Sequence, residues 1–259
     1  MFDTPDKDWP EVLEAQPGHA EDWRDVARRS GYPTPALELK DREARSLWFA
    51  GYTQTYLERD LRDVATVSSL IDFRRLMRVA CLRLGSLVNQ TELGRDVGLS
   101  QPTVHRHLDV LEASYQLVRV PAYAVNRTKR LIKTPKLYWT DTALAMHLAG
   151  EQKPRGCHLE NLILGDLLVW SGSMLDPPQI LYWRTSIGEE VDFVIEWQGQ
   201  LLPVEVKAAS RARVADTTSL RAFRMEYPDV TRAGLLLHAG DETSWLADGI
   251  LAVPWWRVV

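Results

Sequence analysis

Two apolar-rich runs joined by a Gln-Gly pair constrain this sequence more than any other feature. The runs are residues 191–197 and 200–207, and the pair is Gln198-Gly199. An X-Gly pair between two such runs is a strong signal for a β-hairpin with a two-residue loop. A loop at this pair places Trp197 opposite Gln200, which fixes the register of both predicted strands.

This register gives the two faces of the hairpin different chemistry, because side chains alternate between faces. One face is expected to be an unbroken apolar surface, formed by Val191 with Val206, Phe193 with Val204 and Ile195 with Leu202. The other face carries Asp192, Glu205 and Lys207, with the two carboxylates opposite each other. Like charges directly opposite on a sheet are destabilising. We therefore expect a divalent cation, Mg²⁺ or Mn²⁺, at Asp192 and Glu205.

These residue types together suit phosphodiester chemistry. Two carboxylates can share one metal ion whose other positions take water and a phosphate oxygen, and the Val206 carbonyl is a further candidate ligand. Lys207 could orient a water or stabilise charge on a phosphate. Glu160, on a predicted helix before the hairpin, could add a carboxylate. This is the PD-(D/E)xK arrangement. The alternative is a solvated strand face on which Lys207 neutralises Glu205.

Composition and missing motifs exclude several other classes. The net charge of −4 gives no indication of nucleic-acid binding, so any surface that binds nucleic acid must be a local basic patch. The two cysteines, Cys81 and Cys157, lack CxxC spacing, which argues against a thiolate zinc site and fits a reducing cytoplasm. The N-terminus is no signal peptide, and the most apolar run, 159–170, is too short to span a bilayer. No GxxxxGK[ST] loop is present, so we expect no ATP binding.

A second informative segment covers residues 86–140. It predicts a helix over 91–97, a Gly98-Leu99-Ser100 turn, a helix over 101–113, and strands over 116–124 and 136–139. This is the pattern of a winged helix-turn-helix. The polar residues predicted to face outward on the second helix, as a recognition helix requires, are Gln101, Thr103, His105, Arg106 and His107.

The loop between the two wing strands is the one distinct cationic patch. Residues 126–136 hold five basic side chains and no acid. Contact with DNA phosphates is predicted for Arg127, Lys129, Arg130 and Lys133. A solvated hairpin and a winged helix that binds protein, including a second copy in a homodimer, remain equally open.

The remaining patterns define an α+β chain of two domains. Residues 1–150 are predicted to be a helical region containing the winged helix, with a loosely docked lead-in over 1–20 and helices over 20–29, 41–60, 71–84 and 141–148. Residues 151–259 are predicted to be an α/β PD-(D/E)xK, restriction-endonuclease-like domain. Its predicted elements are a helix over 159–170, strands over 180–184, 191–197 and 200–207, a helix over 217–225, and strands over 233–238 and 250–253.

Several short stretches in combination resemble a bacterial and archaeal family of AAA-type ATP-binding proteins with a C-terminal domain of unknown function. The resemblance runs from about residue 20 to the end. The stretches are Gly31-Tyr32-Pro33, residues 52–60, residues 99–104, residues 135–141, Leu159-Glu160, Tyr182-Trp-Arg, residues 190–193 and residues 203–207.

The resemblance implies a winged helix followed by a PD-(D/E)xK-like nuclease fold, with Asp192, Glu205 and Lys207 as nuclease-like residues and Glu160 as an addition. The family's ATPase module has no counterpart here. Two functions follow as hypotheses. One is a metal-dependent nuclease acting on DNA. The other is a non-catalytic DNA-binding or partner-binding module, such as a subunit of a separate ATPase. A fragment, a stand-alone member and a degraded gene all fit the missing module.

Overall fold

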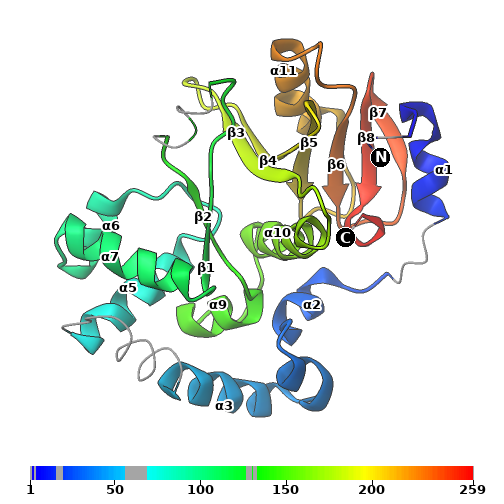
Figure 1. Cartoon of the computed structure of the whole chain (residues 1–259). Helices are drawn as coiled ribbons and strands as arrows, with labels where there is room; N and C mark the ends of the chain where they lie inside the picture. Colours follow the sequence, from blue (N-terminus) through cyan, green and yellow to red (C-terminus); the bar gives the residue numbers. More distant parts are fainter. Residues whose placement is uncertain are drawn as a thin grey trace. The chain divides into compact units, whose positions relative to one another are not determined.

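The computed structural model describes residues 2, 4–15, 20–55, 69–126, 130 and 133–258 (Figure 1). Their contacts separate into two compact units. The sheet unit comprises Met1–Trp23, Val120–Lys133 and Ile163–Val259, and the helical unit comprises Arg24–Arg119 and Thr134–Leu162. The boundary predicted after residue 150 follows chain order, whereas these units are each assembled from several segments.

The helical unit is built mainly from helices that begin at a capping side chain. Its elements are α2 (Trp23–Arg29), a π-helix (Thr34–Glu38), α3 (Arg42–Tyr52), α5 (Leu70–Leu82), α6 (Gln90–Val97), α7 (Gln101–Ala113), β1 (Leu117–Val120), β2 (Lys136–Trp139), α9 (Thr142–Ala149) and the first part of α10 (Gly156–Gly172). Residues before α3, α5, α6, α7 and α9 accept a hydrogen bond from an N–H in the first turn; they are Asp41, Ser69, Asn89, Ser100 and Asp141.

A glycine turn joins α6 to α7. Gly98 has φ 74°, the left-handed conformation that ends many helices. A Cβ on Gly94 would lie 2.5 Å from the Leu99 carbonyl oxygen, so only glycine fits where the two helices meet. The inward face of α7 includes Val104, Leu108 and also His107, which is 1 % exposed. The predicted outward position of His107 is wrong, because the helical repeat places it beside Val104 and Leu108.

The sheet unit contains a six-stranded mixed sheet in the order β3-β4-β5-β6-β8-β7. The strands are β3 (Gln179–Arg184), β4 (Glu190–Trp197), β5 (Gln200–Lys207), β6 (Gly234–His238), β7 (Ser244–Ala247) and β8 (Ile250–Pro254). Strands β3, β4 and β5 pair antiparallel, β5 with β6 and β6 with β8 pair parallel, and β7 pairs antiparallel with β8. The helix α11 (Thr218–Glu226) connects β5 to β6.

Both faces of the sheet are apolar over much of their area. On one face, Val194 and Leu236 pack with Leu220 and Phe223 of α11. On the other, Ile195 and the second part of α10 line the same pocket. The prediction of a single apolar face is therefore incomplete. The face that carries Asp192 and Glu205 is also apolar where it packs against α11, and the two carboxylates lie at one end of it.

Val191 departs from the predicted alternation. It belongs to the same cluster as Val194, although an even strand would place these residues on opposite faces. The pairing of β3 with β4 shifts register between Leu181 and Trp183. A bulge of this kind changes which face a side chain takes, so Val191 pairs with Trp183 instead of continuing the Phe193 and Ile195 row.

Three other elements differ from the prediction. The lead-in contains α1 (Trp9–Glu14), docked through Trp9 at 3 % and Leu13 at 4 % exposure. The strand predicted over 116–124 ends at Val120, and Ala122 instead forms a bridge with Tyr182. The unpredicted β7 forms a hairpin with β8.

The end of the helix predicted over 41–60 lies outside the described residues. The part of the chain that the structure describes holds no helix with the length and apolarity to cross a membrane.

Candidate functional site

The β4–β5 hairpin has the predicted loop and register. Gln198 and Gly199 both take positive φ, 49° and 78°, as a type I′ turn requires. Trp197 pairs with Gln200, and the ladder continues to Phe193 opposite Val204. Asp192 and Glu205 are the next residues along each strand.

Asp192 lies next to the last β4–β5 pair, Phe193 with Val204, and contacts β5 through its side chain. Its Oδ2 accepts a hydrogen bond from the Val206 N–H at 3.0 Å. Asp192 is 9 % exposed, and the register shift between β3 and β4 lies beside it. Bulges commonly re-aim a side chain at the end of a paired segment. Asp192 is thus held against β5 by the backbone, with its orientation fixed.

Glu205 and Lys207 form an ion pair on β5. Lys207 Nζ donates to Glu205 Oε1 at 2.5 Å, and the side chains are 35 % exposed for Lys207 and 8 % for Glu205. Burial by itself would lower the pKa of Lys207, but the charge and hydrogen bond of Glu205, with the charges of Asp192 and Asp216, raise it above its usual value. Lys207 is therefore a cation at neutral pH and no general base.

Lys207 ends its strand beside a second titratable group that the sequence analysis left without a role. His238 is the parallel partner of Lys207 and ends β6. Its Nδ1 accepts the Gly240 N–H at 3.0 Å, so its Nε2 carries the proton and donates to the Glu242 carbonyl at 2.9 Å. Burial lowers the pKa of His238, which keeps the ring neutral.

Two more features shape this end of the sheet. A Cβ on Gly240 would lie 1.9 Å from the Ser210 carbonyl oxygen, so the loops after β5 and β6 touch through a glycine. Asp216 accepts a hydrogen bond from the Arg213 N–H at 2.9 Å and adds negative charge near Lys207. The carboxyl ends of parallel strands are a common place for ligand sites in open sheets. The hairpin sequence gave no signal for Asp216 or His238. His238 lies beside Lys207 only through the pairing of β5 with β6, and Asp216 belongs to the short helix Val214–Thr217 that follows β5.

Glu160 belongs to the helical unit. There Tyr138 Oη donates to Glu160 Oε2 at 3.3 Å. Asp192, Glu205 and Lys207 are brought together by one hairpin of the sheet unit. Among the described residues, no group of three or more His, Cys, Asp and Glu side chains has the spacing to hold a metal ion. The two buried carboxylates of the hairpin are Asp192 and Glu205.

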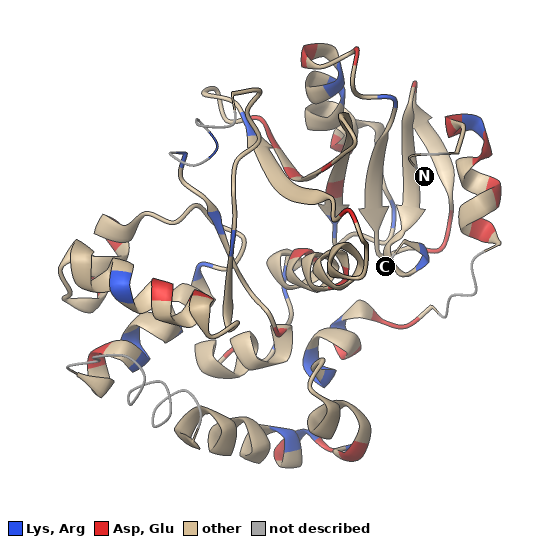
Figure 2. Ribbon diagram, in the orientation of Figure 1, with Lys and Arg blue, Asp and Glu red and all other residues tan. Residues whose placement is uncertain are grey.

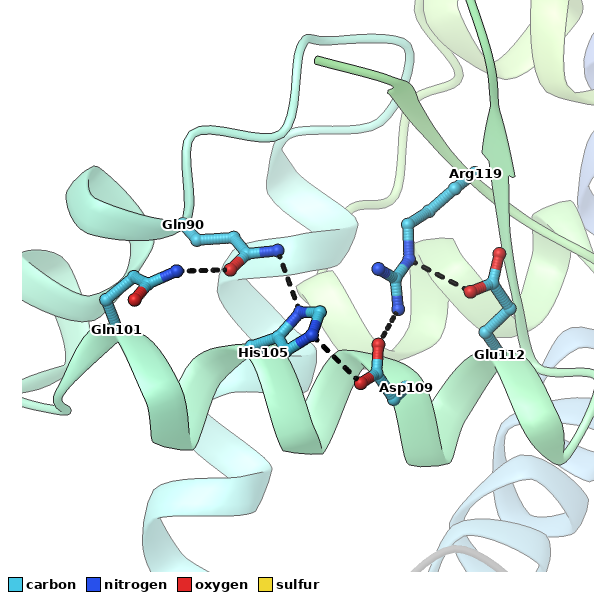
Figure 3. A network of polar contacts seen from close by, with 6 residues as sticks. All are labelled: Gln90, Gln101, His105, Asp109, Glu112 and Arg119. Carbon is cyan, nitrogen blue, oxygen red and sulfur yellow. Dashed lines mark hydrogen bonds and ion pairs between the residues drawn. The ribbon is translucent and has the colours of Figure 1, made fainter. Parts of the chain in front are cut away.

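The outward face of α7 carries a network of polar side chains rather than a row of unengaged ones (Figure 3). Gln101 Nε2 donates to Gln90 Oε1 at 3.0 Å, and Gln90 Nε2 lies 3.2 Å from His105 Nδ1. His105 Nε2 in turn lies 3.3 Å from Asp109 Oδ2. Further along, Arg119 contacts both Asp109 and Glu112. The network holds the side chains of Gln101 and His105 along the helix surface.

The other two predicted residues of α7 differ in their engagement. Thr103 receives its capping contact from Ser100, whose Oγ lies 2.9 Å from Thr103 Oγ1. Arg106 is exposed. Over the helices, acidic and basic residues are interspersed (Figure 2). Of the predicted outward side chains, Arg106 is the one that offers a positive charge to solvent.

The predicted cationic loop is only partly described. Arg127 and Lys129 lie outside the described residues, and Lys133 is exposed. Arg130 is 6 % exposed and forms a two-point ion pair with Glu196, one arm of which, Nη2 to Oε1, is 3.0 Å long. Its guanidinium also lies 4.8 Å from the centre of the Tyr123 ring. This guanidinium is therefore engaged within the sheet unit by a carboxylate and an aromatic ring, whereas Lys133 is open to solvent.

The chain is similar to proteins without a described function. It is 29 % identical over 235 residues to an uncharacterized protein of Mycobacterium tuberculosis and to one of Mycobacterium bovis. Each match covers 87 % of this chain and 51 % of the relative, so the chain spans about half the length of these curated relatives. No solved structure matches it at a significant level.

Two family profiles match in succession. "Domain of unknown function (DUF4143)" matches residues 155–258, which include the β4–β5 hairpin and α11. "Domain of unknown function (DUF8612)" matches residues 20–155, which include the α6–α7 pair. Since this second match covers more than half of the 259 residues, the chain belongs to the family described as Domain of unknown function (DUF8612).

Proposed function

We propose that this protein is a metal-dependent phosphodiesterase of the PD-(D/E)xK type that acts on DNA. The observation that carries the proposal is the junction of Asp192, Glu205 and Lys207 at one end of the β4–β5 hairpin. Two carboxylates and one lysine lie close together there, and a bound metal ion would offset the cost of burying the second negative charge.

The donor set fits Mg²⁺ or Mn²⁺. Such ions take one or two protein carboxylates and keep positions for water and substrate phosphate, so Asp192 and Glu205 suffice as protein ligands. When bound, the ion would activate a water and polarise a phosphate oxygen. The Val206 N–H orients Asp192, and Lys207, which stays protonated, stabilises negative charge developing on the phosphate.

The order of elements supports the same fold. A helix, three antiparallel strands, a helix and a parallel strand follow one another as α10, β3–β5, α11 and β6. This is the order expected for a PD-(D/E)xK core, with the acidic pair on its second and third strands. DNA contact is assigned to the α6–α7 pair, read as a helix-turn-helix with β1 and β2 as its wing. Arg106 and Lys133 are the described cations that would reach phosphates.

The test is cleavage of linear and supercoiled DNA by the intact chain with Mn²⁺, Mg²⁺ or EDTA. We expect metal-dependent cleavage that falls by at least about a hundredfold in Asp192→Asn and in Lys207→Met, as for removal of a group that acts on the transition state. Asp229→Asn, an exposed carboxylate remote from the hairpin in sequence, serves as the matched control. Equal cleavage by Asp192→Asn and wild type would exclude this function.

A second candidate is a non-catalytic module that binds DNA or a partner such as a separate ATPase. The favouring observation is that Lys207 already neutralises Glu205 through a 2.5 Å contact. The curated relatives also extend well beyond the matched segment. This candidate predicts salt-dependent DNA binding without cleavage. Light scattering of wild type and Arg106→Ala would show whether the α7 surface instead joins two copies.

A further inference from the structure

A pocket of about 340 Å³ lies between α3 and α9 in the helical unit. One face of α3 contributes Arg42, Arg45, Ser46 and Phe49, which follow the i, i+3, i+4, i+7 spacing of a single helical stripe. The facing stripe of α9 includes Ala143, Met146 and His147. The volume is within the range of small-molecule sites. The pocket is therefore formed mainly by the facing sides of two helices.

The charge of the lining is positive although the whole chain is acidic. Three arginines line the pocket, Arg28, Arg42 and Arg45, against one carboxylate, Glu151. That carboxylate is already engaged, since Arg155 Nη2 lies 2.7 Å from Glu151 Oε1. The lining thus carries two formal positive charges beyond Glu151, in a chain whose net charge is −4.

The three guanidinium groups are differently held. Arg45 is anchored by Nε, which donates to the carbonyls of Leu39 at 2.8 Å and Pro35 at 3.2 Å. Arg28 is shared with Asp25, its partner at 2.9 Å. Within the described residues, Arg42 has no recorded side-chain partner. An anchored Nε fixes the plane of a guanidinium and leaves its fork for a ligand, which is the geometry that suits phosphate or carboxylate.

The floor of the pocket is apolar. Phe49 and Met146 are each 4 % exposed, and the His147 ring lies 5.5 Å from the Phe49 ring. Burial lowers the pKa of His147, so the imidazole is neutral at pH 7 and extends the aromatic surface rather than the positive charge. The site joins an anion-attracting side to an aromatic one.

We propose that this pocket binds a small organic phosphate monoester whose other part is aromatic or otherwise apolar. A monoester carries roughly −1.5 to −2 charge at pH 7, which matches the excess charge of the lining. The guanidinium groups bind the phosphate and Phe49 contacts the apolar part. A purely structural role for the arginines, offsetting the partial negative charge at the C-terminal end of α9, is the alternative that the experiment must separate.

Isothermal titration of the intact chain, without added metal, tests the proposal with phenyl phosphate, inorganic phosphate, benzoate and benzyl alcohol. We expect phenyl phosphate to bind about tenfold or more tightly than inorganic phosphate or benzoate, and benzyl alcohol not to bind, because both halves of the pocket are then used. Arg42→Gln should weaken phenyl phosphate binding about tenfold. Arg95→Gln, an exposed arginine on α6 of the same unit, should leave it unchanged.

Several outcomes would overturn the proposal. They are a lack of phenyl phosphate binding at millimolar concentration, an equal loss in Arg95→Gln and Arg42→Gln, and equal binding of phenyl phosphate and benzyl alcohol. Arg42→Lys provides the second variant, since it keeps the charge and loses the fork, and an intermediate affinity is expected. Asp192→Asn should bind phenyl phosphate like wild type, so failure of the proposed nuclease function and failure of this site are distinguishable.

Discussion

Asp141 Oδ2 accepts a hydrogen bond from the main-chain N–H of Gly31 at 2.7 Å, across 110 positions of the sequence. The same carboxylate accepts from Ser30 Oγ at 2.8 Å, while Oδ1 caps α9 through the Leu144 N–H at 2.7 Å. Burial raises the pKa of Asp141, and these hydrogen bonds partly offset that rise. Two of the short stretches that carried the family resemblance therefore meet at one carboxylate inside the helical unit.

Replacing Asp141 should destabilise the helical unit. Asp141→Ala leaves the N–H groups of Gly31 and Leu144 without this acceptor, and we expect a loss of about 2–4 kcal/mol in the free energy of unfolding. Asp41→Ala, which removes an exposed N-cap of α3, is the comparison and should lose about 1 kcal/mol. Urea unfolding followed by circular dichroism measures both. Similar losses in the two variants would show that the contact with Gly31 contributes little.

The Arg130–Glu196 pair makes a second stability prediction. Arg130→Ala removes the two-point ion pair from Glu196, whose side chain is 17 % exposed, and should destabilise the protein by about 3 kcal/mol. Replacing both residues, as Arg130→Met with Glu196→Leu, should recover most of that loss because no buried charge remains. Thermal unfolding checks the single and double variants. If Arg130→Ala instead keeps its stability and loses DNA affinity, the phosphate-contact role predicted from the sequence would be restored.

DNA binding should depend on the exposed cations rather than on the buried one. Arg106→Ala and Lys133→Ala should each weaken binding to unrelated DNA sequences to a similar extent. Each should also reduce the slope of log K against log salt by about 1. Fluorescence anisotropy at several salt concentrations measures this slope. Arg95→Ala, an exposed arginine on α6, is a charge-matched control, and an identical change there would show that only net charge matters.

The Glu205–Lys207 pair should have a signature at high pH. Because the folded pKa of Lys207 is raised, the stability that it contributes is fully present below its unfolded pKa of about 10.4 and is lost as pH rises through the higher folded value. The difference in Tm between wild type and Lys207→Met should therefore be constant from about pH 6 to 9 and shrink above about pH 10.5. A difference independent of pH would mean that packing of the lysine stem, not its charge, stabilises the fold.

The elements that were predictable from sequence carry their determinants locally. Gln198-Gly199 sets the hairpin register, and Ser100 with Gly98 sets the start of α7, which runs over the predicted residues 101–113. The hairpin of β7 and β8 has such a signal too, since Asp248-Gly249 separates the strands and Gly249 has φ 62°. It was missed because β7 is only four residues long, and none of these residues is fully buried.

The features that could not be predicted from the sequence depend on contacts between residues that are far apart in the chain. Val191 lies on the unexpected face because the pairing of β3 with β4 shifts register, and no pattern within residues 191–207 predicts this shift. The sequence predicted Arg130 to be a cation of the wing, because its ion-pair partner Glu196 is 66 positions away in the chain. The position of His238 beside Lys207 requires the parallel pairing of β5 with β6. In the candidate site, local spacing was enough to predict which residues take part, but their hydrogen bonds and ion pairs could be known only from the tertiary structure.

The multi-segment make-up of the sheet unit bears on how this protein can be dissected. Residues before and after the junction of the two family profiles at residue 155 both contribute to that unit, and the Tyr123 N–H donates to the Tyr182 carbonyl across the junction at 2.6 Å. A protease cut there should leave two pieces that copurify under native conditions and separate only in denaturant. Expressing residues 155–258 alone would omit a strand-like segment and the arginine partner of Glu196, so a truncated clone chosen from the profile boundary is a poor sample for activity assays.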